Sequence, residues 1–220
     1  MASEPFQDTG ATPAVRGHVH RPAKAGGDAV VLTHGAGGNC NAPLLVALCE
    51  AFAQHGFVAL RCDLPYRQAR PSGPPRGSDK EDRAGLRRAV EVVRKEVRGR
   101  VFLGGISYGG RQATMLVAEE PQLADGLLVL SYPLHPPGKP EQLRTKHLPH
   151  LRVPALFVSG DKDPFGSPEE LAAAVKLVPG TPRLMIVEGA GHDLGYGKRA
   201  KSKSAELPQR IREAFLKMVG

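Results

Sequence analysis

Short apolar runs of the β-strand type alternate with helical patterns along most of this 220-residue chain. The apolar runs fall at 29–33, 57–62, 101–105, 126–131, 155–159 and 184–187. The helical patterns fall at 43–55, 83–97, 110–119, 168–177 and 206–218. Strands that alternate with helices form a parallel sheet with helices on both faces. The sequence therefore predicts an α/β fold with a mostly parallel central sheet, and 15–20 indicates an additional antiparallel strand at its edge.

The length suits one compact domain spanning 1–220, and we expect its first 13 residues to be flexible. The polar start lacks the basic segment and apolar core of a signal peptide, and no run reaches the length of a membrane span. The three cysteines are an odd number and form no C-x-x-C pair, so neither a disulfide framework nor a zinc site is indicated. We expect a cytoplasmic protein without metal or cofactor.

Positive charge is in excess, with 30 Lys and Arg against 22 Asp and Glu. The charges are scattered, which is typical of a solvated surface. The densest run, 198–203, contains no aromatic residue, and the chain has no Trp to stack on bases, so no nucleic-acid partner is expected. An alternative is a binding module that holds an acidic partner through Arg67, Arg70, Arg76 and Lys139, for which binding would weaken steeply with salt.

The motif Gly105-Ile106-Ser107-Tyr108-Gly109 follows an apolar run directly and precedes a helical pattern. G-x-S-x-G in this context is typical of a nucleophile elbow, a strained turn that presents a serine above the end of a sheet. The sequence therefore predicts Ser107 as a nucleophile.

A glycine-rich segment, Thr33-His34-Gly35-Ala36-Gly37-Gly38-Asn39, follows the first long apolar run. Such a turn can aim backbone N–H groups at the oxygen where negative charge develops, and we assign this role to the amides of Ala36 and Tyr108. We expect His34 to support this loop. The alternative of a phosphate-binding loop lacks the required Gly-Lys-Ser/Thr signature.

The acid and the base are predicted from two later strand ends. Asp163 is the chosen acid in Ser159-Gly160-Asp161-Lys162-Asp163-Pro164, with Asp161 as the alternative and a simple Asp-Pro turn as the structural interpretation. His192 follows the last apolar run in Glu188-Gly189-Ala190-Gly191-His192. The order Ser107, Asp163, His192 is the order that a nucleophile elbow of this type requires.

Two loops rich in proline and basic residues, 64–82 and 133–154, follow strands and are expected to border the site. The second loop is too short for a lid, so we expect an open site. The candidate substrate contacts are His34, Gly37, Arg67, Arg111 and His135. Arginines here favour a substrate that carries a carboxylate, although ordinary loop charges are the alternative.

The segments HGAGG, GISYGG, SGDKDPFG and EGAGHDL, in this order, resemble the α/β-hydrolase superfamily and in particular its small lidless members. The segment from Leu134 to Pro140 and GDKDPFG resemble hydrolases grouped with testis-expressed protein 30, which are similar to the dienelactone hydrolase group. Dienelactone hydrolases use a cysteine nucleophile, whereas this elbow holds Ser107.

The resemblance implies a serine hydrolase with Ser107, Asp163 and His192 as its triad. We expect it to cleave small-molecule carboxylic esters with small or exposed acyl groups. Amide, peptide or lactone hydrolysis by the same triad is the alternative chemistry.

Overall fold

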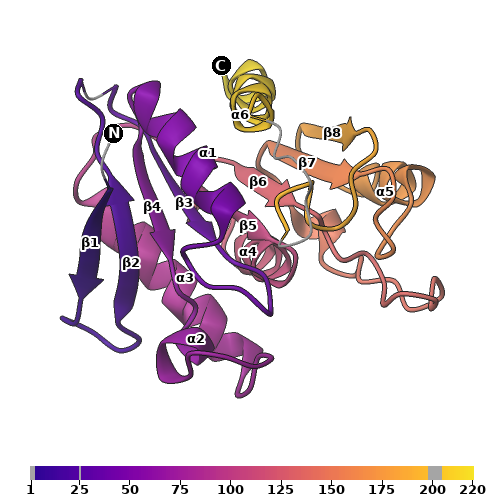
Figure 1. Ribbon diagram of the computed structural model, residues 1–220, viewed down its shortest axis with the longest axis horizontal. Coiled ribbons are helices and arrows are strands. Elements are labelled where there is room, and N and C mark those ends of the chain that lie inside the picture. The colour runs from indigo at the N-terminus through magenta and orange to yellow at the C-terminus, as the bar shows by residue number, and fades with distance from the viewer. Residues whose placement is uncertain (1–2, 25, 198–204) are drawn as a thin grey trace.

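The computed structural model describes residues 3–24, 26–197 and 205–220. Within these ranges one eight-stranded sheet has the order β1-β2-β4-β3-β5-β6-β7-β8 (Figure 1). The strands are β1 (Ser3–Asp8), β2 (Val15–His20), β3 (Ala29–Thr33), β4 (Val58–Cys62), β5 (Val101–Ile106), β6 (Leu127–Leu130), β7 (Ala155–Gly160) and β8 (Pro182–Val187). The helices are α1 (Pro43–Gln54), α2 (Pro65–Ala69), α3 (Asp79–Arg94), α4 (Tyr108–Glu119), α5 (Pro168–Val175) and α6 (Leu207–Val219). The basic run at 198–203 lies outside the described residues.

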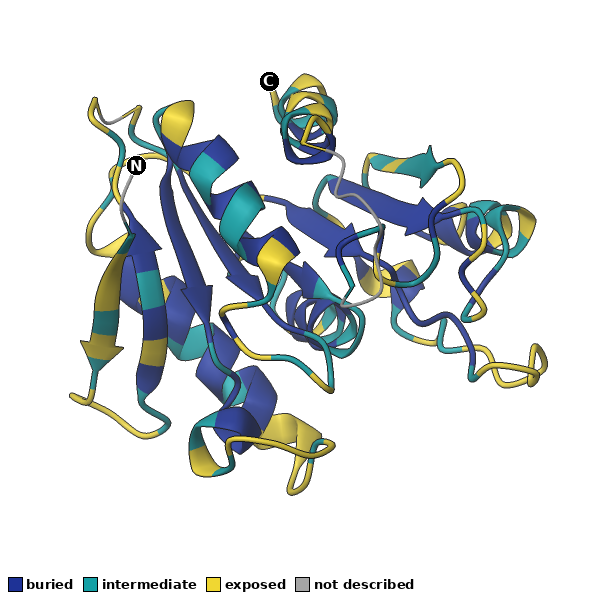
Figure 2. Cartoon of the chain, viewed as in Figure 1, coloured by how far each residue is buried: buried dark blue, intermediate teal, exposed yellow. Residues whose placement is uncertain are grey.

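The strands from β3 to β8 pair in parallel, which confirms the prediction from the alternating pattern. The central strands are buried except for Ile106 at the end of β5, and Figure 2 shows the buried parts in dark blue. Burial on both faces explains why these strands are largely apolar, although β4 also contains the buried Arg61. β2 is antiparallel to β4, as 15–20 predicted.

The first residues of the chain correct one expectation. The segment 1–13 was expected to be flexible, but Ser3–Asp8 forms β1 and pairs antiparallel with β2, from Ser3 opposite His20 to Asp8 opposite Val15. This strand is polar apart from Phe6, so its backbone pairing with β2 positions it rather than an apolar pattern. β1 is therefore the edge strand, and β2 lies inside the sheet.

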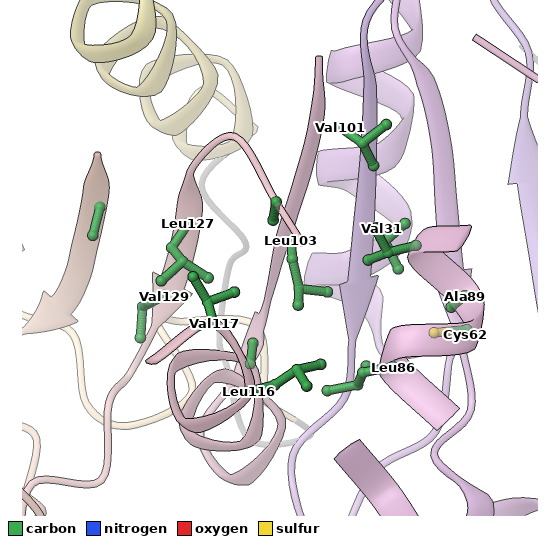
Figure 3. Close-up of a cluster of buried hydrophobic side chains, with 14 of the residues drawn as sticks. Val31, Cys62, Leu86, Ala89, Val101, Leu103, Leu116, Val117, Leu127 and Val129 are labelled. Atoms are coloured by element: carbon green, nitrogen blue, oxygen red, sulfur yellow. The ribbon is translucent and has the colours of Figure 1, made fainter. Parts of the chain in front are cut away.

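Helices cover both faces of the sheet and enclose two apolar cores. α1 and α6 pack on one face, where the rings of Phe52 and Phe215 lie 5.8 Å apart. α3, α4 and α5 pack on the other face, where Leu86 of α3 and Leu116 of α4 meet side chains of the central strands (Figure 3). Both faces of the sheet are thus covered by packed helices.

The loop predicted at 64–82 is partly helical. Residues 65–69 form helix α2, and α3 begins at Asp79, before the predicted start at 83. Ser78 caps α3 by accepting a hydrogen bond from the Lys80 amide, and acidic residues occupy the first turn. Between β6 and β7 the chain forms a 3₁₀ turn at Leu148–His150, and the described chain contains no lid domain. None of the helices in the described ranges is long and apolar enough to cross a membrane.

Candidate active site

Ser107 lies in the sharp turn between β5 and α4, where the motif predicted it. Its φ of 52° and ψ of −115° are rare for a residue with a side chain. The turn is closely packed, because a Cβ on Gly109 would lie 2.4 Å from the carbonyl oxygen of His34. Glycine at this position therefore allows the elbow to approach β3 and holds Ser107 at the pocket that it lines.

Three predicted side chains come together at this turn. The Nε2 of His192 lies 2.9 Å from the Oγ of Ser107, and its Nδ1 lies 2.8 and 2.9 Å from the two carboxylate oxygens of Asp163. A carboxylate only accepts hydrogen bonds, so this contact assigns the imidazole proton to Nδ1 and leaves Nε2 to accept from the serine hydroxyl. A neutral imidazole in this position can take the hydroxyl proton as the serine attacks a carbonyl.

The carboxylate of Asp163 is almost completely buried, with 1% of its side chain exposed. Its Oδ1 also accepts a hydrogen bond from the Phe165 amide at 2.9 Å, and its Oδ2 accepts one from the Ser159 hydroxyl at 3.3 Å. These donors compensate for the loss of water around the charge. Asp161, the alternative acid, has a buried Oδ1 without a hydrogen-bond partner among the described residues. The geometry favours Asp163.

The loop that follows β3 lies directly against the elbow. A Cβ on Gly35 would lie 3.4 Å from the Cβ of Ser107, and Ala36 and Gly37 line the same pocket as Ser107. Tyr108 is the first residue of α4, so its amide has no acceptor within the helix. The two amides predicted as donors therefore belong to segments that flank the serine.

His34 supports this loop from inside the fold. Its Nδ1 donates to the Gly35 carbonyl oxygen at 2.8 Å, and its Nε2 accepts from the Leu64 amide at 3.2 Å. The imidazole is fully buried, and this burial lowers the pKa of His34. The position agrees with the supporting role predicted for His34 and corrects the prediction that it contacts substrate.

Arg67 is also buried beneath the loop, with 3% of the residue exposed. Its guanidinium donates to the carbonyl oxygens of Gly38 at 2.7 Å and Ala36 at 3.1 Å, and to those of Gly73 and Arg70. Because backbone carbonyls occupy these donors, Arg67 is not available to a substrate carboxylate. The predicted contact is therefore wrong for this structure.

Arg111 and His135 are not among the residues that line the pocket. The guanidinium of Arg111 is 3.7 Å from the carboxylate of Asp79, and the ring of His135 contacts the Pro136 carbonyl oxygen and the Glu170 carboxylate. Of the predicted substrate contacts, Gly37 is the one that lines the pocket in the described part of the chain.

The pocket at Ser107 has a volume of about 940 Å³. Its walls come from the chain after β3, the elbow after β5, Phe165 after β7 and the segment after β8. No described residue of the loops at 64–82 and 133–154, which were expected there, lines the pocket. Sequence reasoning missed Phe165, Asn41, Leu44 and Tyr196, although each of these follows the end of a strand on the same edge of the sheet. Among the described lining residues none is Lys or Arg, and Asp193 supplies a negative charge. No group of three or more His, Cys, Asp and Glu side chains in the described ranges is placed to hold a metal ion.

A mostly parallel sheet with a strained serine at an elbow, followed in sequence by an aspartate and a histidine at later strand ends, defines the lidless α/β serine hydrolase class. The family model described as alpha/beta hydrolase domain matches residues 26–220, and the chain belongs to this family.

Solved structures with the same fold span nearly the whole chain. A dienelactone hydrolase from Anabaena variabilis has 21% identity and a TM-score of 0.73, covering 97% of this chain and 97% of its own. Est1E from Butyrivibrio proteoclasticus has 16% identity and a TM-score of 0.75, covering 100% and 99%. XC6422 from Xanthomonas campestris, a serine hydrolase without lid, has 16% identity and a TM-score of 0.72, covering 99% and 95%. At these identities the likeness is one of fold, and the narrower resemblance to the testis-expressed protein 30 type stays a prediction.

Proposed function

We propose that this hydrolase cleaves carboxylic esters of small or exposed acyl groups through an acyl-serine intermediate. The observation that carries the proposal is the 2.9 Å contact between the Nε2 of His192 and the Oγ of Ser107, with Asp163 on the other ring nitrogen. The names of two similar structures, a dienelactone hydrolase and a serine hydrolase without lid, support it.

In the proposed reaction, the Oγ of Ser107 forms a bond to the carbonyl carbon while its proton moves to the Nε2 of His192. The carbonyl π electrons move onto the oxygen, where the amides of Ala36 and Tyr108 stabilise the negative charge. The bond to the alkoxy group then breaks, and His192 returns the proton to the departing alcohol. Water deprotonated by His192 attacks the acyl-serine, and the acid and Ser107 are released.

The pocket supports an uncharged ester as substrate. Leu44, Ile106 and Phe165 give it apolar walls, and the described chain contains no lid to cover a long acyl chain. Small acyl groups, or acyl groups exposed on a larger molecule, suit an open pocket of about 940 Å³.

The test is labelling of the wild-type protein with a fluorophosphonate probe, which reacts with activated serines. We expect labelling of the wild type to be lost in Ser107→Ala and His192→Ala. The exposed Ser72→Ala is the matched control and should label as the wild type does. A panel of p-nitrophenyl esters and matched anilides then separates ester from amide hydrolysis.

A folded wild type that neither labels nor hydrolyses any ester would contradict the proposal. Salt-dependent binding to DNA or to an acidic protein would then favour the alternative of a binding module.

We also propose a cytoplasmic location. Cys40, Cys49 and Cys62 are free and buried thiols, which is typical of proteins that stay in a reducing compartment. Fluorescence microscopy of the tagged full chain tests this, and a secreted product would contradict it.

A further inference from the structure

A buried carboxylate on α3 links the two segments that supply the proposed oxyanion donors. The Oδ1 of Asp82 accepts a hydrogen bond from the Tyr66 amide at 3.2 Å, and its Oδ2 accepts one from the Tyr108 hydroxyl at 2.7 Å. Asp82 is 3% exposed. Burial raises the pKa of this carboxyl, and the hydrogen bonds from Tyr108 and Tyr66 act in the opposite direction. An apolar side chain at this buried position could not accept these two hydrogen bonds, so they distinguish Asp82 from an ordinary core residue.

The first of these contacts holds α2 beneath the glycine-rich loop. The residue before α2, Leu64, provides no side-chain cap, so Asp82 supplies the acceptor for an amide at the start of this short helix. A Cβ on Gly85, one turn after Asp82, would lie 2.6 Å from the ring of Pro65. The absence of a side chain at Gly85 therefore lets α2 approach α3 closely enough for this hydrogen bond.

From this position α2 holds the carbonyl groups of the loop. The Tyr66 hydroxyl lies 2.8 Å from the Ala36 carbonyl oxygen and 3.3 Å from that of Gly35. Arg67 donates to the Ala36 carbonyl oxygen as well, and His34 donates to that of Gly35. Since the C=O and N–H of a trans peptide point in opposite directions, a fixed Gly35 carbonyl fixes the direction of the Ala36 N–H.

The second contact holds the other donor. The hydroxyl of Tyr108 is bound to Asp82, and its ring meets the ring of Tyr66 edge to face at 5.9 Å. The Tyr108 amide is the proposed donor at the start of α4. The same carboxylate thus restrains one donor through Tyr66 and the loop, and the other through the side chain of Tyr108.

We propose that Asp82 is a positioning residue that holds the two oxyanion donors at a fixed separation, acting through Tyr66 and Tyr108. This inference rests on the proposed function, because it concerns the charge that develops during acyl transfer. Donors aimed in advance at that charge stabilise the transition state more than the bound substrate, so their displacement lowers kcat and leaves KM nearly unchanged.

The experiment compares wild type, Asp82→Asn, Tyr66→Phe and Tyr108→Phe, after the wild type has been shown to label with a fluorophosphonate and to hydrolyse p-nitrophenyl butyrate. The matched control is Tyr132→Phe, which removes a buried hydroxyl that donates to the Arg144 carbonyl oxygen away from the pocket. Steady-state kcat and KM, thermal unfolding and the inhibition constant of a trifluoromethyl ketone are measured for each. This ketone forms a bond to the Oγ of Ser107, its carbonyl oxygen becomes an oxyanion, and the serine proton moves to His192.

We expect kcat to fall about tenfold in Asp82→Asn, Tyr66→Phe and Tyr108→Phe, with KM within about twofold and the ketone bound about tenfold more weakly. Tyr132→Phe should lower the unfolding temperature without these changes. An unchanged kcat, or a rise in KM alone, in a folded Tyr66→Phe variant would overturn the inference while the proposed function stands. If Asp82→Asn does not fold, Tyr66→Phe and Tyr108→Phe decide the matter. A wild type that neither labels nor turns over would remove the proposed function and this inference with it.

Discussion

The ring of Phe165 lies over the imidazole of His192, with 4.2 Å between the ring centroids and 31° between the ring planes. The amide of the same residue donates to the Oδ1 of Asp163. Phe165 therefore contacts both the base and the acid of the proposed triad, one with its side chain and the other with its backbone. Such a contact restricts the rotation of the imidazole, which its hydrogen bonds to Asp163 and Ser107 alone do not fully determine.

Replacement of Phe165 by Ala is expected to lower kcat about tenfold, because the imidazole then samples orientations that do not face Ser107. The backbone hydrogen bond to Asp163 remains in this variant. Steady-state kinetics with a p-nitrophenyl ester measures the effect. Phe6→Ala on the edge strand β1 is the control, and an equal loss in both variants would show that the effect is one of general stability.

The two candidate acids can be separated by isosteric substitution. Asp163→Asn removes the carboxylate that fixes the Nδ1 proton of His192, and we expect kcat to fall by about 10³ to 10⁴. Asp161→Asn should stay within about threefold of the wild type, since the carboxylate that contacts the Nδ1 of His192 is that of Asp163. The comparison requires kcat at a saturating ester concentration. Similar losses in the two variants would reject the assignment of Asp163.

The tight packing of the elbow predicts a difference between two glycines. In Gly109→Ala the new methyl group would lie 2.4 Å from the His34 carbonyl oxygen and 2.6 Å from the Cγ2 of Thr33. We expect a loss of about 3 kcal/mol or more in the free energy of unfolding. Gly37→Ala places its methyl group in open space and should change this free energy by less than about 0.5 kcal/mol. Urea denaturation measures both, and equal values would contradict the packing described for the turn.

A buried histidine makes stability depend on pH. The Nε2 of His20 accepts a hydrogen bond from Arg61, and burial together with the charge of Arg61 lowers the pKa of His20 to about 4. An unfolded histidine has a pKa of about 6.5, so the unfolded state takes up the proton first as the pH falls. The contribution of His20 is therefore fully present above about pH 6.5 and is lost as the pH falls toward 4.

In His20→Gln, whose amide oxygen can still accept from Arg61, we expect the decrease in unfolding free energy between pH 7 and pH 4.5 to be smaller by about 1 to 2 kcal/mol. His147 contributes a decrease of the same sign, because burial also lowers its pKa to about 4. The decrease in unfolding free energy of His20→Gln is therefore expected to be smaller than that of the wild type, but not zero. Urea denaturation at each pH provides the measurement, with the exposed His55→Gln as control. If the unfolding free energy of His20→Gln and of the wild type fell by the same amount between pH 7 and pH 4.5, His20 would not be a source of the pH dependence.

The parts of the fold that sequence predicted are those that local pattern determines. β3 at 29–33 is a continuous apolar run, and its predicted bounds are those of the structure. Helix α2 and strand β1 escaped prediction because distant partners hold them: Asp82 and Gly85 for α2, and the backbone of β2 for β1. Neither segment has an apolar period of its own.

The candidate site also combines predictable and unpredictable residues. Ser107, Asp163 and His192 each follow a recognisable strand, so the sequence could select the three side chains that the structure brings within hydrogen-bond distance of one another. Arg67 was assigned to substrate because a cation in a loop after a strand is indistinguishable, in sequence, from one that binds backbone carbonyls. Its partners at Ala36 and Gly38 are about thirty positions away, and no local pattern reveals that the guanidinium is buried.

At Ser107 the requirements of the proposed catalysis and of stable folding conflict, because the positive φ of this residue disfavours any side chain. Glycine would adopt a φ of 52° without strain, so a Ser107→Gly protein is expected to be inert and yet more stable than the wild type by about 1 kcal/mol. Selection for a durable scaffold alone would drive this residue toward glycine. Serine at this position therefore lowers the stability of the fold while it supplies the nucleophile of the proposed reaction.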